Sequence, residues 1–130
     1  AAIQTTHNYI DFGDGVWRKG AVRAGAGELL AVALNMRDGM LLVRGKGNPE
    51  WNHSAPHGAG RRIPRGEAKR HTTMREFEAA MADVYSDSVR EETLDESPAM
   101  YKDHGVVMER SRDTCEVVAH VKPILNLKGY

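Results

Sequence analysis

Two short apolar runs joined by an Asp-Gly turn constrain the fold of this chain more than any other feature. Residues 29–34 and residues 40–43 are apolar, and the segments 29–34 and 40–44 both have the length of a strand. Between them lies Arg37-Asp38-Gly39, and an Asp-Gly pair favours the positive φ that a tight turn needs. The pattern therefore predicts a β-hairpin over residues 29–44.

Helical signals begin after a long irregular segment, residues 45–64, of the kind that more often carries function than not. Thr73 and Glu76 have the spacing of a capping box at the start of a helix. Apolar residues then recur at helical spacing and predict one buried face. They are Met74, Phe77, Met81 and Val84.

The rest of the chain predicts a second helix and further strands. Ser97-Pro98 is typical of a helix start, with Ser as the cap and Pro at the first helical position, and Gly105 weakens this helix. Residues 116–121 predict a strand with Pro123 at its edge or beyond it, and residues 16–22 predict a shorter strand. Residues 125–130 are expected to pair with the C-terminal strand or to fold onto the functional site.

These elements predict an α+β fold in one domain, residues 1–130. The expected architecture is a mixed sheet with a β-hairpin, a long active-site loop, two helices and C-terminal strands.

The composition limits the kinds of partner that the chain can have. A length of 130 residues suits a single modest core. Because 18 basic residues balance 18 acidic ones, any contact with nucleic acid has to come from a local cluster of arginines and lysines. Cys115 is the single cysteine, so an internal disulfide is excluded. No apolar run approaches the roughly 20 residues that span a bilayer. We expect a cytoplasmic domain, cut from a longer protein, with no membrane partner.

Residues suited to phosphate chemistry are concentrated around His57. The run Gly58-Ala59-Gly60 follows it, so the backbone can approach a ligand closely and present N–H groups to it. Arg61 and Arg65 come next, and guanidinium groups bind phosphate in a bidentate manner. An imidazole can also act as a covalent nucleophile. From these residues alone, a loop histidine that only makes hydrogen bonds is the alternative.

Several separated stretches of the chain resemble motifs of the RtcB-type RNA-splicing ligases. Their order and spacing match over nearly the whole chain, which corresponds to the C-terminal portion of the family. The matching stretches are His7-Asn8-Tyr9, Arg18-Lys19-Gly20-Ala21, Leu34-Asn35-Met36-Arg37-Asp38-Gly39, Gly45-Lys46-Gly47-Asn48, Ser54-Ala55-Pro56-His57-Gly58-Ala59-Gly60-Arg61, Thr93-Leu94-Asp95-Glu96-Ser97-Pro98 and Lys122-Pro123.

The resemblance implies a reaction and its cofactors. Family members use GTP and manganese to join an RNA end that bears a 3′-phosphate or 2′,3′-cyclic phosphate to a 5′-hydroxyl end, in tRNA splicing or RNA repair. The histidine of the His-Gly-Ala-Gly-Arg motif, here His57, attacks the α-phosphate of GTP and becomes guanylylated. The GMP then moves to the RNA 3′-phosphate, and the 5′-hydroxyl attacks that activated end.

Further roles follow from positions that match the family's motifs. His7 resembles a metal-binding histidine. The implied nucleotide contacts are Asn8, Gly58, Ala59, Gly60, Tyr101 and Lys128, and the implied RNA or phosphate contacts are Arg18, Arg61 and Arg65. The histidines that match no catalytic position, and that are expected to be surface or structural residues, are His53, His71, His104 and His120. Cys115 lies in a strand-like run and is expected to be a small core residue.

The chain also departs from the family pattern. Many relatives have Gly-Ser-Met-Gly where this chain has Leu34-Asn35-Met36-Arg37, serine is common where Pro64 precedes Arg65, and a serine is expected at Met40. The family's metal site also takes a cysteine and further histidines from the N-terminal region, and those motifs are not in this sequence. His7 alone does not complete such a site.

Two interpretations of different classes follow. In the first, the chain is part of a GTP-dependent RNA ligase and works only with the missing N-terminal half. In the second, it is a non-catalytic truncated homologue that keeps a scaffold, phosphate-binding or assembly role. An unrelated histidine-rich metal binder would explain the histidines, although not the ordered motifs. Because strands that pair with the missing half would have open edges, we also expect self-association.

Overall fold

The structure, a computed structural model, describes residues 3–128 and confirms the α+β class. The strands form three antiparallel sheets instead of the one mixed sheet expected from the sequence: β1 pairs with β2, β3 pairs with β6, and β5 lies between β4 and β7. The strands are β1 (Asn8–Asp11), β2 (Val16–Lys19), β3 (Ala21–Arg23), β4 (Leu29–Ala33), β5 (Met40–Gly45), β6 (Ser54–Pro56) and β7 (Cys115–Val121).

Gly20 explains why the sheets are separate. The sequence predicts one strand over residues 16–22, but the backbone at Gly20 has a φ of 66° and turns the chain there. A residue with a side chain disfavours this conformation, whereas glycine adopts it at little cost. The segment before Gly20 therefore pairs with β1, and the segment after it pairs with β6.

The hairpin predicted over residues 29–44 is confirmed. Strand β4 pairs with β5 in a register that places Leu29 opposite Arg44 and Ala33 opposite Met40. The turn ends at Gly39, where φ is 75°, and the side-chain oxygen of Asn35 accepts hydrogen bonds from the backbone N–H groups of Arg37 and Asp38. The long segment after the hairpin is less irregular than expected, because it contains β6 and a 3-10 helix, Pro49–Trp51.

The first predicted helix is also confirmed. The Thr73 hydroxyl accepts from the backbone N–H of Glu76, and the Glu76 carboxylate accepts from the backbone N–H of Thr73, which completes a capping box. The buried face packs into a small second core with Met36 and Leu94. The helices are α1 (Ala68–His71), α2 (Met74–Ala80) and α3 (His104–Ser111), and three more 3-10 helices cover Arg65–Glu67, Glu91–Glu96 and Pro98–Met100.

The second predicted helix starts at Ser97-Pro98 as expected, but it is a short 3-10 helix and does not continue as an α-helix. Ser97 and Pro98 begin a 3-10 helix that ends at Met100, because Tyr101 is extended with φ −105° and ψ 158°. The α-helix begins only at His104, where the Asp103 side chain caps it by accepting from the Gly105 N–H. Gly105 thus lies in the first turn of α3.

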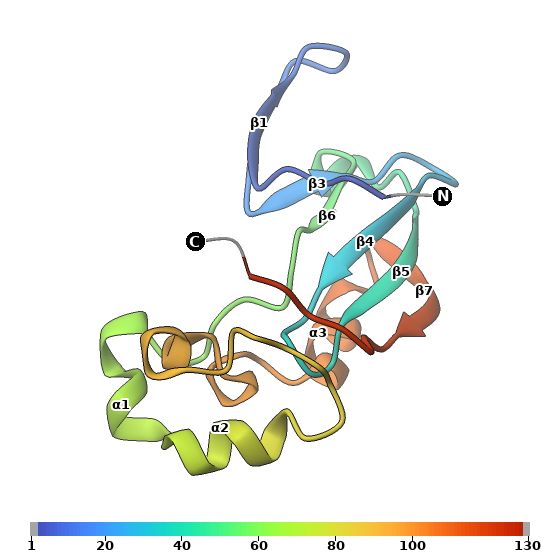
Figure 1. The fold of residues 1–130 in the computed structure, drawn as a ribbon. Coiled ribbons are helices and arrows are strands. Elements are labelled where there is room, and N and C mark those ends of the chain that lie inside the picture. Colours follow the sequence, from blue (N-terminus) through green and yellow to red (C-terminus); the bar gives the residue numbers. More distant parts are fainter. Residues whose placement is uncertain (1–2, 129–130) are drawn as a thin grey trace.

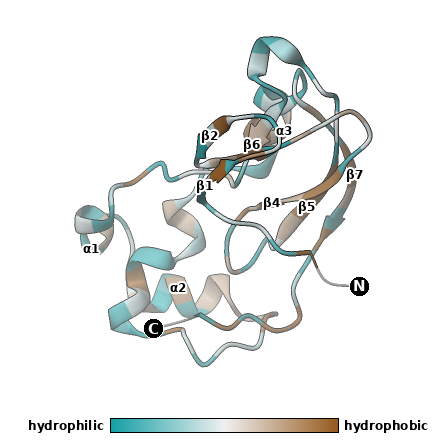
Figure 2. Ribbon diagram, turned by 90° about the horizontal axis from the view of Figure 1, so that it is seen from above, coloured by the Kyte–Doolittle hydropathy of each residue, from teal (hydrophilic) through white to brown (hydrophobic). Residues whose placement is uncertain are grey.

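The main core lies between the three-stranded sheet, α3 and the β3–β6 pair. Figure 2 shows the hydrophobic residues concentrated on β4, β5 and β7, whereas α1 is mostly hydrophilic. Cys115 is buried in this core, as expected, and burial raises the pKa of its thiol. The strand predicted over residues 116–121 is confirmed as β7, and Pro123 lies beyond its end.

The segment after β7 leaves the sheet and runs toward the helical part of the molecule (Figure 1). The backbone N–H of Tyr85 donates to Ile124, and the N–H of Asn126 donates back to Tyr85, so Leu125 pairs in parallel with Tyr85. Up to residue 128 the tail therefore pairs with Tyr85 instead of β7, and Leu125, Asn126 and Lys128 line the pocket described below. Residues 129 and 130 lie outside the described part. Residues 3–128 include no helix with the length and apolar character that a membrane crossing requires.

Candidate functional site

The His57 loop is fixed to the end of β4 by backbone hydrogen bonds. The N–H of Ala33 donates to the carbonyl of His57 at 3.2 Å, and the N–H of Ala59 donates to the carbonyl of Ala33 at 2.8 Å. A Cβ atom at Gly58 would lie 2.9 Å from the Ala33 oxygen, so only glycine fits this approach. The Ala59 N–H is thereby occupied. Among the described residues, the N–H groups of Gly58 and Gly60 have no hydrogen-bond partner and are open to a ligand.

Gly20 connects His57 to His7. Its N–H donates to the His7 carbonyl at 2.8 Å, and its own carbonyl accepts from the His57 N–H at 3.1 Å. The two imidazole rings meet edge to face, with their centroids 5.2 Å apart. The Nδ1 atom of His7 is bonded to the Asn8 side-chain oxygen at 2.7 Å, which orients the ring and leaves its Nε2 atom free.

The environment of His57 favours its neutral form. Burial lowers the pKa of the imidazole, and the nearby His7 lowers it further. Among the described residues, no group makes a hydrogen bond or ion pair to the His57 ring. A neutral imidazole with an unshared ring nitrogen is the form that can act as a nucleophile.

A pocket of about 770 Å³ opens beside His57. This volume is within the usual range for sites that bind small molecules. All of the predicted site residues line it except Asn8 and Arg18. Those present are His7, His57, Gly58, Ala59, Gly60, Arg61, Arg65, Tyr101 and Lys128.

One carboxylate, that of Glu96, joins the cationic residues of this pocket. It accepts hydrogen bonds from Arg61 at 2.7 Å and from Lys128 at 2.8 Å, and it forms an ion pair with Arg65 at 2.8 Å. The Tyr101 hydroxyl donates to it at 2.6 Å. The guanidinium of Arg61 also lies over the Tyr101 ring, 4.9 Å from its centroid.

These contacts dominate the ionisation of Glu96 and Tyr101. Burial by itself would raise the pKa of Glu96, but the hydrogen bonds from Lys128 and Tyr101 lower it to about 2. Burial raises the pKa of Tyr101, and the hydrogen bond to the Glu96 carboxylate raises it further, to about 12. At neutral pH the carboxylate is therefore charged and the phenol carries its proton.

Asn8 and Arg18 are the predicted site residues that the structure does not bring into the pocket. Asn8 lies behind His7 and contacts it. Arg18 is only 2% exposed, and its guanidinium is occupied by Asp14 at 2.6 Å, by Asp11 at 3.3 Å and by two groups of the segment 52–54, which leads into β6. A buried and fully paired guanidinium does not offer donors to a phosphate, so Arg18 holds the β1–β2 hairpin against that segment.

Three residues in or beside the pocket are not among those predicted from the sequence. Asp95 and Glu96 are not part of its lining, but both contact the lining residues Arg61 and Arg65. They lie in the Thr93–Pro98 stretch that carries the family resemblance, so a signal was present although it assigns them no role. Asn126 lines the pocket, and its buried side-chain oxygen has no hydrogen-bond partner among the described residues. The four predicted non-catalytic histidines lie outside the pocket lining.

Some of the departures from the family pattern line this pocket. They are Leu34, Asn35 and Met40, whereas Arg37 and Pro64 are outside its lining. Leu34 and Met40 are larger and apolar where glycine and serine are expected, so this part of the lining is more apolar than the family pattern predicts.

The described residues do not by themselves form a metal centre. Within residues 3–128, no group of three or more His, Cys, Asp or Glu side chains is arranged to hold a metal ion. His7 and His57 supply two imidazoles at most, which is fewer than the ligands that a protein metal site normally has. The manganese site implied by the resemblance therefore does not fit these residues alone.

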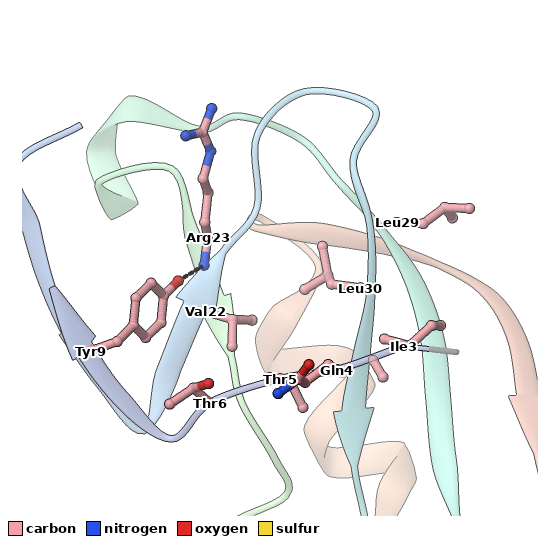
Figure 3. Close-up of a pocket in the computed structure, with 10 residues that line it drawn as sticks. Ile3, Gln4, Thr5, Thr6, Tyr9, Val22, Arg23, Leu29 and Leu30 are labelled. Carbon is pink, nitrogen blue, oxygen red and sulfur yellow. Dashed lines mark hydrogen bonds between the residues drawn. The ribbon is translucent and has the colours of Figure 1, made fainter. Parts of the chain in front are cut away.

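A second pocket, of about 330 Å³, lies elsewhere in the molecule. Figure 3 shows it between the N-terminal segment and the strands β3 and β4, with Tyr9, Val22 and Leu30 in its lining. The Tyr9 hydroxyl accepts from the Arg23 backbone N–H at 2.8 Å. The lining includes none of the predicted site residues, so the His57 pocket is the candidate site.

Comparison with known proteins identifies the family of this chain. The family model described as tRNA-splicing ligase RtcB matches residues 1–129. The chain is 35% identical over 133 residues to RNA-splicing ligase RtcB of Escherichia coli K12, and equally so to RNA-splicing ligase RtcB1 of a second Escherichia coli strain. Each match covers 98% of this chain and 32% of the relative, so the chain spans about a third of the length of these relatives. The chain therefore belongs to the RtcB family.

Proposed function

We propose that this chain carries the nucleotide-accepting part of a GTP-dependent RNA ligase, with His57 as the nucleophile. The observation that carries this proposal is the position of His57. Its imidazole is favoured in the neutral form, lies on a pocket of about 770 Å³, and is followed by the open N–H groups of Gly58 and Gly60. Backbone N–H groups beside a nucleophile stabilise the negative charge that develops on a phosphate under attack.

The proposed reaction has three steps. An unprotonated ring nitrogen of His57 forms a bond to the α-phosphorus of GTP, and the bond from that phosphorus to the bridging oxygen breaks, so pyrophosphate leaves. An oxygen of an RNA 3′-phosphate then takes the GMP from His57, which restores the imidazole. The 5′-hydroxyl of a second RNA end attacks the 3′-phosphorus and loses its proton, and GMP leaves. A 2′,3′-cyclic phosphate has to be opened by water before the second step.

Residues around the pocket have separate roles in this proposal. Gly58, Ala59 and Gly60 line the nucleotide phosphates, and Gly58 and Gly60 supply the open N–H donors. Tyr101 and Lys128 contact the guanine nucleotide. Arg61 and Arg65 bind the phosphate of the RNA end, for which a planar guanidinium is well suited.

The fit of a guanine nucleotide is supported by an unpaired acceptor. The side-chain oxygen of Asn126 is buried at the pocket and has no partner among the described residues. Leaving a buried acceptor unpaired is unfavourable, so this atom favours a ligand that brings a hydrogen-bond donor. The N–H groups of guanine are donors of this kind.

Manganese and the remaining partners are part of the same proposal. His7 contributes one imidazole to the metal, and the other ligands come from outside residues 3–128, in the part of the ligase that this chain does not cover. The bound metal would neutralise charge on the triphosphate. The substrates would be RNA ends produced in tRNA splicing or by RNA damage, and we propose that the reaction takes place in the cytoplasm.

Covalent labelling tests this proposal. The chain is incubated with manganese and α-labelled GTP and then denatured, alone and with the N-terminal two-thirds of a relative added in trans. We expect label on the wild type, no label on His57→Ala, and normal label on His71→Ala, which removes an exposed histidine outside the pocket lining. Label on His57→Ala would refute His57 as the nucleophile. Absence of label from every sample, with the added part present, would favour a non-catalytic scaffold or phosphate-binding role.

A further inference from the structure

The two oxygens of the Glu96 carboxylate serve two different groups of residues. Oε1 accepts a hydrogen bond from Arg61 at 2.7 Å and forms an ion pair with Arg65 at 2.8 Å, and these two arginines are the proposed RNA-phosphate contacts. Oε2 accepts from Tyr101 at 2.6 Å and from Lys128 at 2.8 Å, which are the proposed nucleotide contacts. One side chain thus lies between the two halves of the site.

Asp95, the neighbouring acid, does not share this position. Its carboxylate contacts Arg61 at 3.4 Å and also pairs with Arg65, and its backbone carbonyl accepts from Arg61. Neither Tyr101 nor Lys128 is among its partners within the described residues. Asp95 therefore acts on the arginine side only, whereas Glu96 acts on both sides.

The Glu96 side chain is well placed to hold its partners. It is 13% exposed, so water screens its interactions weakly. It lies at the end of the 3-10 helix Glu91–Glu96, where the Ser97 N–H bonds to Leu94 and fixes the backbone. A lysine ammonium has three donors and an arginine guanidinium has five, so Lys128, Arg61 and Arg65 keep donors for a ligand while they contact Glu96. Tyr101 gives its one O–H donor to Glu96 and keeps its ring and its oxygen lone pairs for a ligand.

We propose that Glu96 is a positioning residue that holds Tyr101 and Lys128 ready for the guanine nucleotide and Arg61 and Arg65 ready for the RNA phosphate. This inference rests on the proposed function for the identity of the two ligands. The contact to Lys128 also tethers the C-terminal segment, because Lys128 and Glu96 are 32 residues apart in the chain. Groups that are held in place before binding lose less freedom when the ligand arrives, so affinity rises.

Substitution of Glu96 by glutamine tests whether this residue serves both sides of the site. Glutamine has one acceptor oxygen and one NH₂ donor group, so it cannot accept from both pairs of partners. Glu96→Gln should weaken the binding of GTP and of a 3′-phosphorylated oligoribonucleotide by about tenfold each, the size expected for a lost charged hydrogen bond. Asp95→Asn should weaken only the oligonucleotide. Glu92→Gln, in the same 3-10 helix but exposed and without a partner among the described residues, should change neither.

A second measurement needs no ligand. Hydrogen exchange of the backbone amide of Asn126, which donates to Tyr85, should be faster in Glu96→Gln than in the wild type and unchanged in Asp95→Asn and Glu92→Gln. Thermal unfolding of each variant shows whether the fold itself is kept. If the wild type binds no GTP, the proposed function fails, and the exchange measurement still decides the positioning role. Wild-type exchange at Asn126 in Glu96→Gln, or equal losses of affinity in Glu96→Gln and Asp95→Asn, would overturn the proposal.

Discussion

The imidazole rings of His7 and His57 lie 5.2 Å apart at an interplanar angle of 71°, although 50 positions separate them in the sequence. Gly20 makes this possible, because it bonds to the backbone of both residues and contributes no side chain between them. The consequence is electrostatic. A proton on one ring disfavours a proton on the other, so His7 helps to keep His57 in the neutral form.

Replacement of His7 should therefore raise the pKa of His57. In the metal-free chain, we expect the pKa of His57 to lie below its ordinary value of 6.5 and to move toward that value in His7→Gln. It should stay below 6.5, because burial is the larger cause. Titration of the His57 ring followed by NMR measures both values. The control, His71→Gln, should leave the His57 pKa unchanged, and a His57 pKa that is identical with and without His7 would contradict the prediction.

Arg18 should stabilise the folded chain, because its guanidinium is buried between Asp11, Asp14 and Ser54. Replacement of Arg18 by methionine keeps much of the side-chain volume and removes the charged partner of Asp14 and one of the two cationic partners of Asp11. We expect the free energy of unfolding, measured with urea, to fall by about 3 kcal/mol.

Arg112→Met is the matched control for Arg18, since it removes an arginine whose ion pair with Glu109 is exposed. Its effect should be much smaller, because water and salt screen exposed pairs. Equal losses in the two variants would show that burial of Arg18 is not what matters.

Acid should destabilise the chain partly through Glu96. The pKa of this carboxylate is about 2 in the folded chain and 4.5 ordinarily, so the unfolded chain binds a proton more readily. The stabilisation is complete above pH 4.5 and is lost as the pH falls from 4.5 to about 2. We expect the urea midpoint of the wild type to exceed that of Glu96→Gln. This difference should be largest at neutral pH and should disappear as the pH falls from 4.5 to about 2. A difference that stays constant as the pH falls through this range would contradict the assignment of the contacts.

Gly39 should tolerate no side chain. Its φ is 75°, and an added Cβ atom would lie 2.2 Å from the carbonyl oxygen of Val121 on β7. We expect Gly39→Ala to lower the free energy of unfolding by at least about 2 kcal/mol, from the strained φ and the clash together. Gly27→Ala isolates the first effect, because Gly27 has a φ of 82° with nothing near its missing Cβ. The free energy of unfolding of Gly27→Ala should fall by about 1 kcal/mol. Equal decreases in Gly39→Ala and Gly27→Ala would show that the clash with Val121 has no effect.

Self-association remains a prediction for the isolated chain. β4 and β7 are the outer strands of the three-stranded sheet, and Val118 and Val121 of β7 are exposed. Open strand edges pair readily with another copy. Light scattering should show a mass that rises with protein concentration, and Val118→Lys should reduce the rise because a charge on an edge strand opposes pairing. A monomer mass that is constant up to the highest concentration would refute this expectation.

Local features of the fold could be predicted from the sequence because their signals act between close neighbours. The hairpin around Asp38-Gly39 depends on residues that adjoin in the chain, and the capping box depends on Thr73 and Glu76, three positions apart. The family motif around His57 also supplied five of the predicted residues that line the pocket, His57, Gly58, Ala59, Gly60 and Arg61. These predictions need no knowledge of which distant segments meet.

The tertiary structure decided how the charged side chains are paired. Arg18 matches a family motif, yet it is buried against Asp14 and Ser54 instead of facing the pocket. Glu96 became the centre of the site only because Arg61 and Lys128, 35 and 32 positions away, fold against it. Charge pairs form between whichever side chains the packing of the core brings together, and their energies depend on burial. Sequence patterns report periodicity and local geometry, so they determined the elements and the motif residues, whereas the partner of each charge was set by the fold.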